Sequence, residues 1–194
     1  MRQILRVGQP PIIRMDYKDY RQLPDDGMRY ELLEGDLEMA SAPAYGHQWV
    51  VYRLWRILDD LVREGLLGEA MGAPLDVVLA ERTVVQPDLV AVVKERTGIF
   101  GPKGITGRPD LIVEVVSAGR GSYDRSRKRL LYERYAVPHY WVIEPKKREV
   151  EEYVRSRGKL RLRRVWKEKE AMRPAVVPGA SIVLASIWPP LKAL

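Results

Sequence analysis

The sequence predicts a mixed α/β (α+β) protein with a central mixed β-sheet flanked by helices. Three observations predict this class. Apolar residues recur at helical spacing over residues 45–64, and the runs 83–93 and 111–117 are almost continuously apolar, which suits strands covered on both faces. Helical and strand-like patterns also alternate along the chain instead of segregating.

The first half of the chain is expected to begin with helices around a hairpin. Asp16 can cap a short helix that Pro24 ends, and Gly65 stops the long helix. The expected elements are a helix at 16–23, hairpin strands at 30–33 and 37–40, a helix at 45–64, and strands at 73–79 and 83–93.

The second half is expected to alternate in the same way. Residues 94–109, rich in glycine and charge, are typical of a loop. Ser122 can cap a second long helix, and Gly158 can turn an exposed hairpin. The expected elements are a strand at 111–117, a helix at 123–135, strands at 139–143, 149–155 and 159–166, and a last apolar stretch at 181–187.

Composition places limits on the class of protein. The 194 residues are 46% hydrophobic and 30% charged, which suits one soluble domain over residues 1–194. No apolar run reaches the roughly 18 residues needed to cross a bilayer. The basic start of the chain is broken by glycine and proline and does not resemble a signal peptide. We therefore expect a cytoplasmic protein with no membrane partner.

The sequence has no cysteine and two histidines, which excludes disulfides, thiolate nucleophiles, cysteine-ligated zinc and a histidine-rich metal site. Any metal must be held mainly by carboxylates, which favours Mg²⁺ or Mn²⁺. The net charge of +7 favours a polyanionic partner, nucleic acid before membrane. The alternative is a basic soluble protein whose charge has no partner.

Glu114 is unusual because it is a charged residue within the apolar run 111–117, and this position suggests a catalytic or metal-binding role. A buried carboxylate must find a partner or take up a proton. Asp88 follows Pro87 at the start of another apolar run. Adjacent strands would bring the two acids within about 5 Å, and a divalent cation would offset their repulsion. The alternatives are a strand end where Glu114 meets solvent or arginine, and a simple Pro-Asp turn.

Lys128 is the third candidate. Asp124, Lys128, Leu131, Tyr132 and Tyr135 share one face of the expected helix. The lysine lies beside the apolar part of this face, so its ammonium can reach back toward Glu114. There it can orient an attacking water or offset developing phosphorane charge. The alternative is an ordinary surface ion pair with Asp124.

Six sequence blocks occur in an order that resembles a known family. They are YELLEG at 30–35, HQ at 47–48, VVQPDLV at 84–90, PDLIVEVVS at 109–117, DRSRK at 124–128 with Tyr132, and VPHYWVIEP at 137–145. This set resembles the Uma-type restriction endonucleases, bacterial members of the PD-(D/E)xK nuclease superfamily. The resemblance covers roughly residues 16–155 and leaves the strands and tail of 156–194 outside it.

The resemblance implies a restriction-endonuclease-like fold with Asp88 and Glu114 as ligands of Mg²⁺ or Mn²⁺. It implies that Lys128 is the catalytic lysine and that Glu31 completes the catalytic set. It also places His47 at a polar position of the family near the site. A surface or capping role is the alternative for this histidine.

Two features depart from the family pattern. The plain (D/E)xK form would place the lysine two residues after the glutamate, where this chain has Val116, so Lys128 must take its place. The segment SAGRGS at 117–122 differs from the Ser-Pro-Ser-Thr-like version of the family. Within it, Arg120 either contacts phosphate or belongs to a surface loop.

The predicted function is hydrolysis of DNA phosphodiester bonds with Mg²⁺ or Mn²⁺. Arg125, Arg127 and Arg129, with the C-terminal basic hairpin, are expected to hold phosphates without reading sequence. One alternative is a nucleic-acid-binding protein that keeps the fold without cutting, and another is a structural protein with an incidental basic surface. We also expect a homodimer, in which the apolar segment 187–194 either joins the interface or covers the core.

Overall fold

The computed structural model describes residues 14–40, 42–117 and 121–190, without the side chains of Ala40 and residues 121–125. The first half contains α1 (Tyr17–Tyr20), β1 (Arg29–Leu33), β2 (Asp36–Ala40), α2 (Tyr45–Arg63), β3 (Glu69–Gly72), β4 (Val77–Ala80), β5 (Thr83–Val85) and β6 (Leu89–Val92). The second half contains η1 (Lys94–Ile99), β7 (Phe100–Gly101), β8 (Gly104–Thr106), β9 (Leu111–Val115), α3 (Gly121–Arg134), β10 (His139–Glu144), β11 (Glu149–Ser156), β12 (Lys159–Lys167), β13 (Ala171–Met172), β14 (Ile182–Val183) and η2 (Leu184–Ser186).

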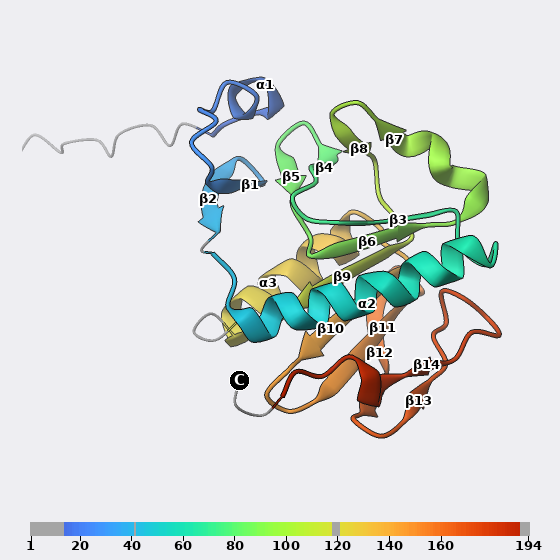
Figure 1. Cartoon of the computed structure of the whole chain (residues 1–194). Coiled ribbons are helices and arrows are strands. Elements are labelled where there is room, and N and C mark those ends of the chain that lie inside the picture. Colours follow the sequence, from blue (N-terminus) through green and yellow to red (C-terminus); the bar gives the residue numbers. More distant parts are fainter. Residues whose placement is uncertain (1–13, 41, 118–120, 191–194) are drawn as a thin grey trace, which may run out of the picture.

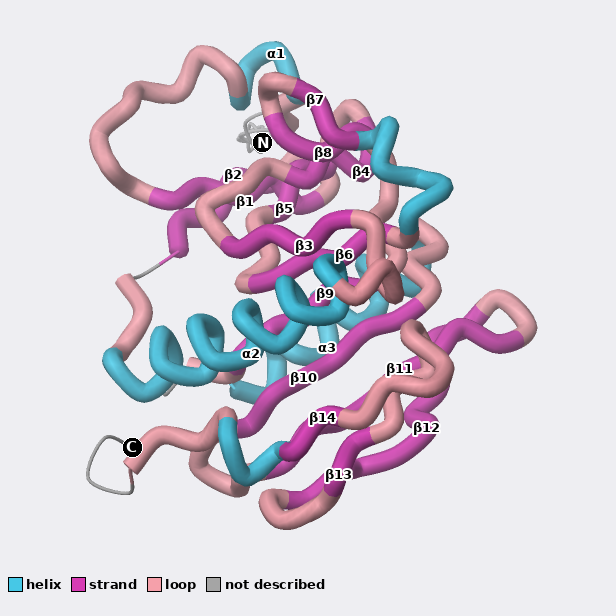
Figure 2. The backbone as a smooth tube through the Cα atoms, turned by 45° about the vertical axis from the view of Figure 1, so that its right-hand side comes forward, coloured by secondary structure: helices cyan, strands magenta, loops and turns pink. Residues whose placement is uncertain are grey.

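Two six-stranded sheets form the body of the protein (Figures 1 and 2). Sheet A has the order β2-β1-β5-β4-β8-β7, and sheet B has the order β12-β11-β10-β9-β6-β3. Sheet B is mixed, because β9 and β10 run parallel while its other neighbours run antiparallel. The mixed α/β class with a helix-flanked sheet is therefore confirmed. The sequence patterns predicted one central sheet and did not indicate that sheet A is a second one.

The two faces of sheet B bury different partners. On one face α2 packs with the C-terminal segment over residues such as Leu89 and Val113. On the other face α3 and sheet A pack over residues such as Val90 and Ile112. Because neighbouring residues of a strand point to opposite faces, each position of β6 and β9 can be assigned to one of these two layers. This assignment places the acidic side chains discussed below.

The helix signals at Asp16 and Gly65 match the structure, whereas Ser122, the expected cap of the helix at 123–135, lies inside α3, which begins at Gly121. Asp16 caps α1 by accepting hydrogen bonds from the amides of Lys18 and Asp19. The buried residues of α2 fall at the spacing of one helical face. The helix ends just before Gly65, whose φ is 73°. Gly27, which has a φ of 76°, lies in the same left-handed region, where glycine is favoured.

The apolar run 83–93 forms two strands in two different sheets. Residues 86–88 carry the chain from β5 in sheet A to β6 in sheet B. Pro87 lacks an amide proton for either ladder, and the Gln86 amide donates instead to Glu31 Oε1 at 2.8 Å. Of the expected strand at 73–79, only residues 77–79 form a strand, within β4, and β3 lies before that range. The expected loop at 94–109 contains the elements η1, β7 and β8.

The C-terminal segment packs against the core. Ile187 and Trp188 are buried in the same apolar cluster as α2, so these two residues cover the core, while Leu191 and Leu194 lie outside the described residues. In the described ranges, every helix is too short or too polar to cross a membrane.

Candidate active site

The register of sheet B brings Asp88 and Glu114 side by side. Leu89 of β6 pairs with Val113 of β9 in an antiparallel ladder, so the residue before Leu89 lies next to the residue after Val113. Glu114 is two residues from Ile112, and Asp88 is two residues from Val90, so each acid points to the same face as its apolar neighbour. Both apolar residues belong to the layer under α3. The two acids therefore lie on the same face of the sheet.

Asp88 is held by two donors. The Val115 amide donates to Asp88 Oδ2 at 2.8 Å, and His47 Nε2 lies 3.1 Å from the same oxygen. The His47 ring comes from the first turn of α2, and its Nδ1 is buried with no hydrogen-bond partner among the described residues. Because a carboxylate oxygen only accepts, the ring donates to Asp88 through its Nε2 hydrogen. The predicted approach of His47 to the site is thus a direct contact.

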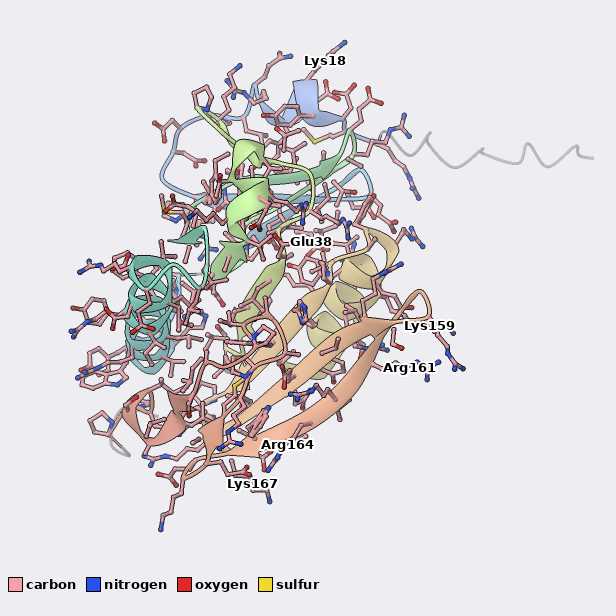
Figure 3. The ribbon with its side chains drawn as sticks, turned by 90° about the vertical axis from the view of Figure 1, so that its right-hand side faces the viewer. Lys18, Glu38, Lys159, Arg161, Arg164 and Lys167 are labelled. Carbon is pink, nitrogen blue, oxygen red and sulfur yellow. The ribbon has the colours of Figure 1, made fainter. Side chains whose placement is uncertain are left out.

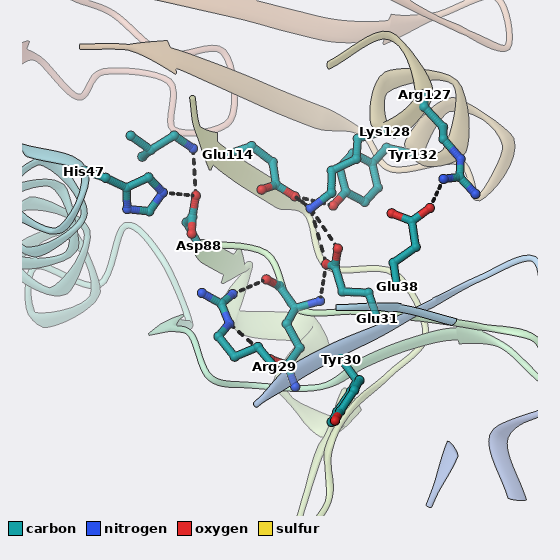
Figure 4. Close-up of polar contacts among 12 residues, drawn as sticks. Arg29, Tyr30, Glu31, Glu38, His47, Asp88, Glu114, Arg127, Lys128 and Tyr132 are labelled. Carbon is teal, nitrogen blue, oxygen red and sulfur yellow. Dashed lines mark hydrogen bonds and ion pairs between the residues drawn. The ribbon is translucent and has the colours of Figure 1, made fainter. Parts of the chain in front are cut away.

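Glu114 receives its donors from α3. Tyr132 OH donates to Glu114 Oε1 at 2.5 Å, and Lys128 Nζ donates to the same oxygen at 3.0 Å (Figure 4). Burial, as the main cause, and the negative charges of Asp88 and Glu31 raise the pKa of Glu114 to about 7, although the Lys128 charge and the Tyr132 hydrogen bond oppose this shift. The carboxyl is therefore in a site that disfavours its charge.

Lys128 connects Glu114 with Glu31. Its ammonium lies 3.1 Å from Glu31 Oε2 and 3.0 Å from Glu114 Oε1. Glu31 comes from β1 of sheet A, so α3 presents the lysine where the two sheets meet. Among the alternatives for Lys128, the structure places the ammonium at the acids. The Asp124 side chain lies outside the described residues.

The donor chemistry of this site fits a hard divalent cation. Among the described residues, the hydrogen bonds and ion pairs of Asp88 all reach Oδ2, and those of Glu114 all reach Oε1. One carboxylate oxygen of each acid thus remains for a ligand, and oxygen is the donor that Mg²⁺ and Mn²⁺ prefer. The described ranges contain no group of three or more metal-binding side chains. Two protein carboxylates suit an ion that completes its shell with water and phosphate.

Of the arginines predicted to bind phosphate, the structure describes the side chains of Arg127 and Arg129. Arg120 lies outside the described residues, as does the side chain of Arg125. Arg127 forms ion pairs with Glu38 and Asp36, and Arg129 lies 4.0 Å from Glu133. These two arginines are thus engaged by acids, and their contact with phosphate stays a prediction.

The basic hairpin presents a second set of cations on β12, the edge strand of sheet B. Lys159 and Arg161 lie toward one end of this strand, and Arg164 and Lys167 toward the other (Figure 3). All four residues are exposed.

Three contributors to the site were given no role in it by the sequence analysis, although Tyr132 and Gln86 belong to the blocks that resemble the family. The Tyr132 hydroxyl was expected only as part of a core-facing residue. Gln86 holds Glu31 through its backbone amide, and Arg29 donates to the Gln86 carbonyl at 2.8 Å. The position of Gln86 in the polar break before Asp88 was the only signal in the sequence.

Comparisons with known proteins show the family and the fold of this chain. The sequence family Uma2, described as "Putative restriction endonuclease", matches residues 17–185. A solved structure from Anabaena variabilis ATCC 29413, titled as a putative nuclease belonging to DUF820, superposes with a TM-score of 0.73 at 14% identity, over 90% of this chain and 97% of that chain. No curated protein matches. The solved structure shows a shared fold, and because the family match spans most of the chain, this protein belongs to the Uma2 family of restriction-endonuclease-like proteins.

Proposed function

We propose that this protein is a Mg²⁺-dependent endonuclease that hydrolyses DNA phosphodiester bonds, with Mn²⁺ able to replace Mg²⁺. The observation that carries the proposal is the pairing of Asp88 and Glu114 on one sheet face, each with one oxygen outside the hydrogen bonds described above. The membership of the chain in a family of restriction-endonuclease-like proteins supports DNA as the substrate.

Asp88 and Glu114 would hold the cation, which when bound polarises a phosphodiester and lowers the pKa of a bound water. The amide of Val115 and the ring of His47 hold the Asp88 carboxylate in place through Oδ2. Tyr132 does the same for Glu114 from the α3 side. The protein thus fixes both acids before any substrate arrives, which is the preorganisation that catalysis requires.

Lys128 would supply the positive charge next to the reacting phosphate. Its ammonium can donate to an attacking water or to a phosphate oxygen once substrate binds. Glu31 positions this ammonium through a 3.1 Å ion pair, and the Gln86 amide fixes Glu31 in turn. Glu31 therefore serves in this proposal as the residue that orients the lysine.

Cations of the β11–β12 hairpin would hold the DNA backbone without reading sequence. Cutting both strands of a duplex needs two active sites, which a homodimer would supply.

The test is nicking of supercoiled plasmid with Mg²⁺, with Mn²⁺ and with EDTA. We expect nicking with either metal, none with EDTA, and none from Asp88→Asn. Asp110→Asn is the matched control, because Asp110 also follows a proline and is equally buried, yet it pairs with Arg96 and the Val93 amide at the opposite end of β9. It should nick DNA as the unsubstituted protein does.

Two results would contradict the proposal. Equal loss of nicking in both aspartate variants would show a general effect on folding rather than a metal site. Retained DNA binding without nicking under any metal would favour a protein that keeps the nuclease fold and only binds nucleic acid.

A further inference from the structure

A surface cavity of about 370 Å³ lies between α2 and β3. Tyr52 and Trp55 of α2, Met71 of β3 and Leu89 of β6 line it, with Gln48 as a polar wall. Tyr52 is 57% exposed and Met71 is 42% exposed, so the cavity presents apolar and aromatic groups to solvent. Exposed apolar surface in a hollow marks a binding site more often than scattered apolar residues do.

The cavity adjoins the candidate active site through residues that are next to Asp88 and His47 in the chain. Leu89, which lines the cavity, directly follows Asp88, and the Ala73 amide donates to the Asp88 carbonyl at 3.1 Å. Gln48 directly follows His47, which touches the Asp88 carboxylate. The cavity opens on the α2 side of sheet B, whereas the two acids face α3. Because Leu89 directly follows Asp88, a DNA strand that bends around the N-terminal end of β6 would contact both.

Positive charge flanks the aromatic wall. The Arg56 guanidinium carbon lies 5.9 Å from the ring centre of Tyr52, which lines the cavity. On the same helix, that of Arg53 lies 4.9 Å from the ring centre of Trp49, a ring outside the cavity lining. An aromatic face beside arginines is the combination that unpaired nucleotides require, since the rings stack on bases and the cations hold phosphates.

We infer that this cavity binds one unpaired nucleobase of the DNA substrate, so that the enzyme prefers DNA with a single-stranded or flipped-out nucleotide beside the scissile bond. The volume is near the lower end of small-molecule sites, which suits one base. A base stacked within a duplex cannot enter, whereas an extruded base can. This inference rests on the proposed function, because the phosphate next to the bound base would reach Asp88 and Glu114.

The test measures binding in EDTA, where no cleavage occurs. One duplex carries 2-aminopurine opposite an abasic site, and a second carries the same base paired with thymine. The unpaired probe should bind about tenfold more tightly, and its fluorescence should fall on binding, because stacking on one aromatic ring contributes about that factor. Tyr52→Ala should abolish the preference, and Tyr52→Phe, which keeps the ring, should retain it.

Tyr45→Ala is the matched control, because Tyr45 is on the same helix and is 64% exposed, but it does not line the cavity. It should keep the preference. Equal affinity for both probes, or equal loss in both alanine variants, would overturn the inference. So would a dimer that Tyr52→Ala dissociates in sedimentation while base preference persists, because a second copy would then occupy the cavity.

Plasmid nicking separates this inference from the proposed function. Metal-dependent nicking without a preference for the unpaired probe would overturn the proposal that the cavity binds a base, and would leave the nuclease proposal standing. A preference that depends on Tyr52, without nicking, would support the cavity as a base-binding site and overturn the nuclease proposal.

Discussion

Glu114 and Glu152 lie in the same sheet, on β9 and β11, but their surroundings differ. Glu152 is fully buried, and both of its oxygens accept hydrogen bonds: Oε2 from Arg163 and from the Trp166 ring, and Oε1 from the Ala175 amide. Within the part of the chain that the structure describes, Glu114 accepts hydrogen bonds only through Oε1, and the acids Asp88 and Glu31 lie near it. A buried acid with donors on both oxygens anchors structure. One with a remaining oxygen and acidic neighbours is suited to a cation.

The largest effect that would test this comparison is expected from Glu114→Gln. Nicking should fall by about a thousandfold, while the free energy of unfolding without metal should stay the same or rise. The reason is that the amide removes a buried charge and its repulsion from Asp88 and Glu31. Nicking rates and urea unfolding in EDTA measure the two quantities. A clear loss of stability would make Glu114 a structural acid like Glu152.

The next largest effect is expected from Lys128→Met. Nicking should fall by about a hundredfold, because the reacting phosphate loses a positive neighbour. Mn²⁺ should nevertheless bind more tightly without DNA, since the ammonium 3.0 Å from Glu114 opposes a second cation. Calorimetric titration with Mn²⁺ measures this, with the exposed Lys103→Met as control. Weaker Mn²⁺ binding would show that the lysine organises the acids instead of competing with the metal.

Glu152→Gln should affect stability and leave chemistry intact. An amide nitrogen would face donors from Trp166 or Ala175 and would lose the charge that pairs with Arg163. We expect a loss of about 2–3 kcal/mol in the free energy of unfolding, measured by urea denaturation, with nicking by the folded protein unchanged. If stability were unaffected, filled hydrogen bonds on both oxygens would not distinguish the two glutamates.

The same comparison shows what the sequence could and could not predict. Glu114 was found because a charge interrupts an apolar run. Glu152 lies in an alternating, charged hairpin, where one more charge is not unusual, and its partner Ala175 comes from a segment that only the fold brings near. The division of 83–93 between two sheets was missed for a related reason. Both halves are apolar, so periodicity carries no information about the change of sheet.

The two Pro-Asp dipeptides show the same limit. Pro87-Asp88 and Pro109-Asp110 are alike in sequence, and each precedes an apolar run. Register places Asp88 next to Glu114, whereas Asp110 lies before the opposite end of β9 and pairs with Arg96. The sequence analysis proposed Asp88 from its place before an apolar run, and the resemblance implied the same residue, but neither carried the register that separates the two aspartates. Strand β3 was not predicted, since EAMG is short and lacks the β-branched residues that indicate strands.

The smallest expected effect comes from Tyr132→Phe, which removes the hydroxyl from Glu114 and leaves the buried ring in place. The loss of one 2.5 Å hydrogen bond should lower nicking by about fivefold and cost about 1 kcal/mol of stability. Lys128 still holds the same oxygen, so the carboxylate should keep its position. Nicking that falls as far as in Glu114→Gln would mean that the hydroxyl, and not the remaining oxygen, gives Glu114 its role.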